Sequence, residues 1–106
     1  MKEQPNTTYI DEIAGGNVDF KEKLITIIKT EFPQEKKHFS AVFEAKKYSE
    51  AAEAVHKLKH KINIFGLSTG YQVASDFEKD LHKGKIIFYN DFMAILEIIE
   101  IYLKTI

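Results

Sequence analysis

Apolar residues recur along the chain at spacings of three and four, the period at which they line one face of an α-helix. Glycine and proline are scarce, and they interrupt this pattern at only a few positions. The pattern predicts a short helix over residues 9–14, ended by Gly15-Gly16, and four longer amphipathic helices after it. We therefore expect an all-α protein, an up-down four-helix bundle with a short extra N-terminal helix.

Polar caps and helix-breaking residues predict where these helices begin and bend. A side chain that accepts a hydrogen bond from the first helical turn favours the N-cap position. The expected N-caps are Thr8, with Asp11 as its capping-box partner, then Asn17, Ser49 and Asn90. Pro33 lacks a backbone donor and disfavours helical geometry at the preceding residue. The second helical segment is therefore expected to bend there or to split into two short helices.

Residues 86–89, Ile-Ile-Phe-Tyr, are the one stretch with the composition of a β-strand. A strand needs a partner to be stable, and the sequence contains no second alternating run. A sheet is therefore not expected. The chain also has no repeat and no linker-like stretch, so residues 1–106 are expected to form one domain.

Composition and charge limit the kinds of site and partner that the chain can have. The 106 residues include no cysteine, which excludes a disulfide scaffold, a cysteine-ligated metal site and a thiol nucleophile. The formal net charge of −1 offers no overall field for a polyanion, so nucleic acid is not expected as a partner. No apolar run approaches the about 20 residues of a membrane span, and the first residues lack a signal peptide's apolar stretch. We expect a cytoplasmic protein without membrane contact.

The third helical segment carries the candidate chemistry. At about 100° per residue, His56, His60 and Asn63 fall on one helix face, and Lys59 lies at its edge. An imidazole in water is mostly uncharged at neutral pH and can act as a nucleophile. A phosphoryl group on such a ring brings negative charge, which a lysine one turn away can partner. The apolar seam beside this polar face consists of Val55, Leu58, Ile62 and Phe65.

The run His56-Lys57-Leu58-Lys59, followed by Gly66, resembles the histidine-containing phosphotransfer (HPt) domains of two-component phosphorelays. Phe77-Glu78 stands where these domains commonly carry a Leu-Glu pair. The resemblance covers essentially the whole chain, although the diagnostic residues are few. It implies that His56 is the phosphoryl acceptor, that Lys59 stabilises the phosphorylated form and that Gly66 ends the helix or allows close packing.

The same resemblance implies a phosphoryl carrier with a phosphohistidine intermediate rather than an independent kinase. Such a carrier takes the phosphoryl group from a phospho-aspartate on a receiver domain and passes it to another receiver. The implied partners are response-regulator receiver domains and a sensor or hybrid histidine kinase. The resemblance implies no cofactor of the chain's own, because the receiver supplies Mg²⁺. We expect the carrier to be a monomer, although two chains can also close a four-helix bundle.

His60 departs from the family pattern, which usually has glycine immediately after the lysine, and Lys61 and Ile62 replace the small residues that follow. The ring of His60 is expected one turn beyond His56 on the same face. It could crowd an approaching receiver, could hydrogen-bond the phosphoryl group, or could mark a domain that docks without transferring phosphoryl.

Three further interpretations bear on the same helix. Exposed residues near His56 would form a docking rim, for which the candidates are Ile64, Ala52 and Asn63. A non-catalytic interaction module could use this face to dock a receiver or another acidic partner. A metal site could form from Glu53, His56 and His60, which share a face, although lysines alternate through it.

Overall fold

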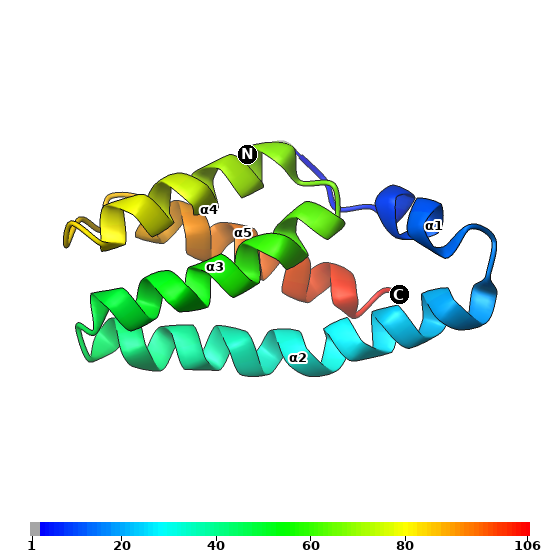
Figure 1. Cartoon of the computed structure of the whole chain (residues 1–106), viewed down its shortest axis with the longest axis horizontal. Coiled ribbons are helices and arrows are strands. Elements are labelled where there is room, and N and C mark those ends of the chain that lie inside the picture. Colours follow the sequence, from blue (N-terminus) through cyan, green and yellow to red (C-terminus); the bar gives the residue numbers. More distant parts are fainter. Residues whose placement is uncertain (1–2) are drawn as a thin grey trace.

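The computed structural model describes residues 3–106, so Met1 and Lys2 lie outside the described part of the predicted domain. It is all-α, and residues 3–106 contain no strand. The helices are α1 (Thr8–Ala14), α2 (Val18–Glu44), α3 (Tyr48–Ile64), α4 (Ser68–Leu81) and α5 (Tyr89–Leu103). Successive long helices run in opposite directions, as the colours of Figure 1 show. The predicted four-helix bundle with a short N-terminal helix is thus confirmed.

The core lies between the four long helices and is formed almost entirely by their apolar seams. The predicted seam of α3 is fully buried: Val55, Leu58, Ile62 and Phe65 each have 0% exposure. Large aromatic side chains from α2, α4 and α5 meet it, namely Phe32, Phe39, Phe77 and Phe92. Because each buried aromatic side chain removes a large apolar surface from water, these residues dominate the stability of the bundle.

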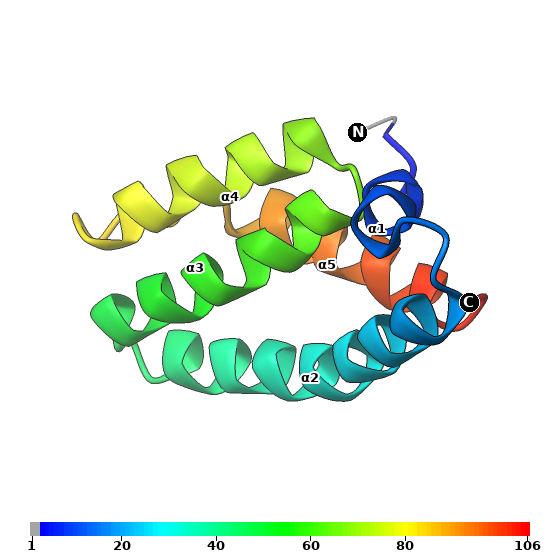
Figure 2. The same cartoon turned by 45° about the vertical axis from the view of Figure 1, so that its right-hand side comes forward.

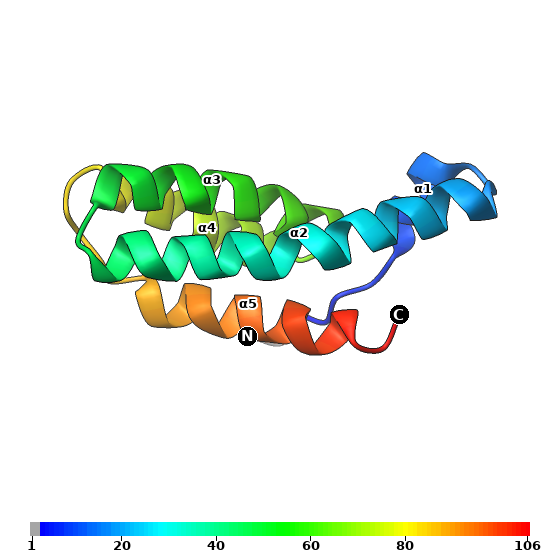
Figure 3. The same ribbon diagram turned by 90° about the horizontal axis from the view of Figure 1, so that it is seen from below.

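Helix α2 runs without interruption through Pro33, so the segment forms one helix and the alternative of two short helices is wrong. Phe32 and Phe39 are fully buried on either side of the proline. Their packing holds both halves of α2 against the core and outweighs the local cost of the missing hydrogen bond. The first half of α2 extends beyond the bundle, next to α1 (Figure 3).

Only one of the expected helix caps is confirmed. The Asn17 side chain accepts a hydrogen bond from the Phe20 N–H at 3.0 Å. The capping box at Thr8 is wrong, because Thr8 lies inside α1 and its N–H donates to Asn6 Oδ1 at 3.0 Å. An asparagine side chain is preferred over threonine as the acceptor for an N–H group at the start of a helix, so Asn6 replaces the predicted threonine–aspartate pair.

The helices α3 and α5 begin at Tyr48 and Tyr89, each one residue before the expected caps Ser49 and Asn90. The ring of Phe43 stacks on Tyr89 with centroids 4.2 Å apart, and it lies 5.8 Å from Tyr48. This aromatic packing draws both tyrosines into the helical ends, which polar capping patterns do not reveal.

The turn between α3 and α4 is held by the N-terminal segment, which lies beside it in Figure 2. Gly66 has φ +78°, and its N–H bonds to Asn63 O while Leu67 N–H bonds to Ile62 O, the pattern of a Schellman motif. Asn6 N–H donates to Phe65 O at 2.9 Å. The geometry therefore fixes the C-terminal end of α3, the helix that carries the candidate site.

Within residues 3–106, none of the helices has both the length and the apolar character required to cross a bilayer.

Candidate functional site

His56 lies in the middle of α3 and faces Glu78 on α4. The side chain of His56 is 53% exposed, whereas that of Glu78 is only 20% exposed. The imidazole Nδ1 lies 3.1 Å from Glu78 Oε2 and 3.3 Å from Oε1. The neighbouring Phe77 is buried in the core, so the local helix geometry places Glu78 at the rim of the α3–α4 interface. The packing of the two helices thus brings this pair together.

Lys59 binds the same carboxylate from one turn further along α3. Its Nζ lies 2.8 Å from Glu78 Oε1, and its side chain is only 13% exposed. The ammonium group also lies 5.7 Å from the centroid of the Tyr71 ring on α4. Lys59 and His56 therefore converge on one carboxylate, and the lysine charge is already partnered in the absence of a phosphoryl group.

Glu78 is held as a carboxylate. Partial burial alone would raise the pKa of Glu78, but the hydrogen bond and charge of Lys59, followed by those of His56, lower this pKa below its ordinary value. A carboxylate can only accept hydrogen bonds, so the Nδ1 of His56 must be the donor. In the neutral ring, the lone pair is then on Nε2.

The ring of His60 lies next to Nε2 of His56, the nitrogen that carries this lone pair. The Nε2 atoms of His56 and His60 are 3.4 Å apart, and the two rings are nearly perpendicular, at 86°, with centroids 4.9 Å apart. Both residues are exposed. The prediction that the two rings share a helix face is confirmed. Polar contacts run from Glu78 through His56 to His60.

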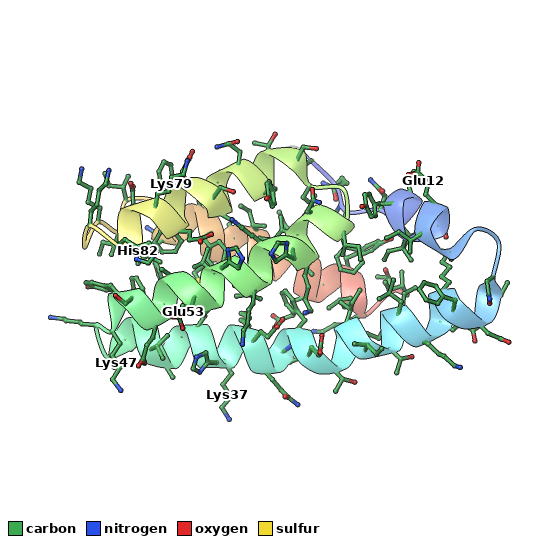
Figure 4. The ribbon with its side chains drawn as sticks, viewed as in Figure 1. Glu12, Lys37, Lys47, Glu53, Lys79 and His82 are labelled. Atoms are coloured by element: carbon green, nitrogen blue, oxygen red, sulfur yellow. The ribbon has the colours of Figure 1, made fainter. Side chains whose placement is uncertain are left out.

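The residues expected to form a docking rim differ in their placement. Asn63 is exposed and Ile64 is half-buried, packed against the core. Ala52 has 0% exposure, so the expectation that it is an exposed rim residue is wrong. It forms part of the floor of a surface hollow next to His56, because α4 packs against α3 at this point. Figure 4 labels Glu53 and His82, which line the same hollow from α3 and from the end of α4.

The alternative of a three-residue metal site from Glu53, His56 and His60 is not supported. Among the residues that the structure describes, no group of three or more histidine, aspartate or glutamate side chains could hold a metal ion. The carboxylate that does reach His56 is Glu78, and it contacts Nδ1 rather than the side of the ring that faces His60.

Two of the lysines on α3 point away from each other and are each partnered. Lys61 contacts Glu35 at 2.8 Å and Glu31 at 3.1 Å, both on α2, whereas Lys59 contacts Glu78 on α4. Their charges are therefore neutralised on opposite sides of α3.

Glu78 is the site residue that sequence reasoning did not assign. In the sequence, Phe77-Glu78 supports the family resemblance but predicts no contact with His56, since no periodicity within α3 can reveal a partner on α4. The available signal was a glutamate directly after a core phenylalanine, which places it at a helix–helix rim.

Comparison with protein-family models, with curated proteins and with solved structures gives no match for this chain.

Proposed function

We propose that this chain is a phosphoryl carrier of the HPt type, with His56 as the acceptor. The observation that carries the proposal is the contact between His56 Nδ1 and Glu78, which fixes the ring so that Nε2 is the nucleophilic nitrogen. The proposal is further supported by the exposed position of His56 in the middle of a rigid bundle helix and by Lys59 one turn away.

In the proposed reaction, the lone pair of His56 Nε2 attacks the phosphorus of a receiver's aspartyl phosphate in line. The N–P bond forms as the P–O bond to the aspartate breaks, and that electron pair stays with the leaving carboxylate. The ring keeps its proton on Nδ1 and becomes positively charged. Glu78 partners this charge, and the receiver supplies Mg²⁺ for the developing charge on the phosphoryl oxygens.

Lys59 has a second role in this proposal. In the resting protein its ammonium group binds Glu78, at the side of His56 opposite to Nε2. A phosphoryl group on Nε2 brings charge that competes with Glu78 for the lysine. Lys59 therefore stabilises the phosphorylated product by moving from Glu78 to the phosphoryl group, while Glu78 stays bound to the positively charged ring of His56.

A second candidate function is a module that docks a receiver without transfer, and one observation favours it. His60 lies 3.4 Å from the attacking nitrogen, on the path that the phosphorus must take. Transfer therefore requires that the exposed His60 ring swings aside, whereas docking alone does not.

The test is incubation with phosphorylated receiver domains and Mg²⁺, scored by intact mass and by acid-labile, alkali-stable phosphate. The carrier is supported by a gain of one phosphoryl group that is lost in His56→Gln while helical content stays unchanged. His82→Gln is the matched control, because His82 lines the same hollow but forms no hydrogen bond with His56, whose partners are Glu78 and His60. Receiver binding without any phosphoryl gain would instead support the docking module.

A further inference from the structure

We propose that His56 and His60 form a two-nitrogen chelating site for Zn²⁺, which blocks the nitrogen that accepts the phosphoryl group. The two residues are one helical turn apart on the exposed face of α3, and their Nε2 atoms face each other at 3.4 Å. The regulatory part of this proposal rests on the proposed function of His56, whereas the metal site itself does not.

The distance between the two nitrogens fits tetrahedral coordination. Zinc binds histidine nitrogen at about 2.0–2.1 Å, and two such bonds at a tetrahedral angle place the nitrogens about 3.3–3.4 Å apart. The observed separation is 3.4 Å. In the metal-free protein the same two atoms lie within hydrogen-bonding distance, with His60 Nε2 as the donor when His56 carries its proton on Nδ1, so metal binding would replace a hydrogen bond.

Glu78 supplies the outer contact that histidine ligands of zinc usually make. A metal-bound imidazole donates its other N–H to a carboxylate or carbonyl, which fixes the ring and makes the ligand more basic. His56 Nδ1 lies 3.1 Å from Glu78 Oε2, so this arrangement is already present. The lone pair on Nε2, required for attack on phosphorus, is the same lone pair that a metal ion requires.

Two of the three lysines of α3 near the site are neutralised by carboxylates, and the third, Lys57, is exposed to solvent, which screens its charge. The ammonium group of Lys59 is bound to Glu78 at 2.8 Å, and that of Lys61 is bound to Glu35 and Glu31 on the far side of α3. With two protein ligands, the ion retains water in its other positions, because both histidines are exposed. The site is therefore an open one, suited to reversible binding.

Zinc titration of the full chain, followed by calorimetry and by long-range ¹H–¹⁵N NMR of the histidine rings, tests the site directly. The expected result is one Zn²⁺ per chain, with the Nε2 resonances of both histidines shifted. His60→Gln should lose this stoichiometric binding, and Glu78→Gln should weaken it about 10–100-fold. His82→Gln should bind as the wild type does, because His82 lines the same hollow as His56 but takes no part in the His56–His60 pair.

Saturable binding that survives His60→Gln, or that is lost in His82→Gln, would overturn the site, as would the absence of saturable binding. The regulatory role is tested by adding equimolar Zn²⁺ to the phosphotransfer assay. Zinc should suppress phosphorylation of the wild type and leave His60→Gln unaffected, and equal suppression of both would locate the effect in the receiver. If the chain binds zinc but accepts no phosphoryl group from any receiver, the proposed function fails while the metal site stands.

Discussion

The carboxylate of Glu78 on α4 lies 3.1 Å from Nδ1 of His56 on α3, and this contact determines which ring nitrogen is available for chemistry. A residue on a neighbouring helix thus orients the His56 ring, the candidate nucleophile, through the nitrogen that does not attack. At the opposite edge of the ring, Nε2 lies 3.4 Å from Nε2 of the exposed His60. The site therefore has a fixed inner side, formed by packed helices, and an adaptable outer side.

Replacing Glu78 by glutamine should release this orientation. An amide can both donate and accept, so it no longer requires the Nδ1 proton of His56. The population of the ring with its lone pair on Nε2 should fall, as ¹⁵N chemical shifts of the imidazole would show. Phosphorylation by a receiver should slow about tenfold, the lower end of the loss seen when a histidine loses its orienting carboxylate. A wild-type rate in Glu78→Gln would show that the orientation is unnecessary.

Lys59→Ala should reduce the yield or the lifetime of the phosphorylated protein. Its ammonium group is the cation one turn from His56, and without it the phosphoryl charge has no lysine partner at that edge of α3. Lys57→Ala is a matched control on the same helix, because Lys57 is exposed and, unlike Lys59, forms no ion pair with Glu78. The role proposed for Lys59 is dismissed if both variants hydrolyse their phosphohistidine at the wild-type rate.

His60→Gly should retain or accelerate phosphoryl transfer, because it removes the ring that lies 3.4 Å from the attacking nitrogen. Glycine inside a helix costs about 0.5–1 kcal/mol relative to alanine, so His60→Ala separates the effect of the ring from that of the backbone. Transfer rates of both variants should be compared at equal receiver concentration. A complete loss of transfer in both would show that His60 takes part in the reaction.

The fold could be predicted from the sequence further than the site could. Helical periodicity is a local property, so the apolar seam of α3 and the number of helices follow from it directly. The starts of α3 and α5 depend on Tyr48 and Tyr89 packing against a ring from α2, and the continuity of α2 depends on core contacts on both sides of Pro33. The position of Glu78 beside His56 is likewise a tertiary contact between helices, which no pattern within one helix specifies.

Gly66→Ala should lower the free energy of unfolding by more than the cost of backbone strain alone. Gly66 has φ +78°, a conformation that costs an L-residue about 1–2 kcal/mol, and a Cβ there would come within 2.8 Å of Asn6 Nδ2. Gly84 is the matched control, since it has φ +71° with no neighbour within 4 Å. In urea denaturation, Gly66→Ala should lose more stability than Gly84→Ala. Equal losses would mean that Asn6 moves aside without cost.

Glu3 caps the N-terminus of α4 from a distant part of the chain, and its loss should destabilise the bundle in a pH-dependent way. Its carboxylate accepts hydrogen bonds from the N–H groups of Thr69 at 2.9 Å and Gly70 at 3.1 Å, while the N-cap residue of α4 is the apolar Leu67. Burial alone would raise the pKa of Glu3, but these backbone hydrogen bonds lower this pKa below its ordinary value.

A carboxyl group whose pKa is lower in the folded state stabilises the fold above its unfolded pKa, and this contribution disappears as the pH falls through the folded pKa. Glu3→Gln should therefore lower the free energy of unfolding by about 1 kcal/mol at pH 7, the typical value of a helix cap. The difference from the wild type should shrink as the pH falls below about 4. Urea denaturation at pH 7 and pH 3 measures both values. Glu12→Gln, which removes one exposed carboxylate of α1, controls for the change of charge. A deficit in Glu3→Gln that is equal at both pH values would show that the ionised carboxylate is not the cap.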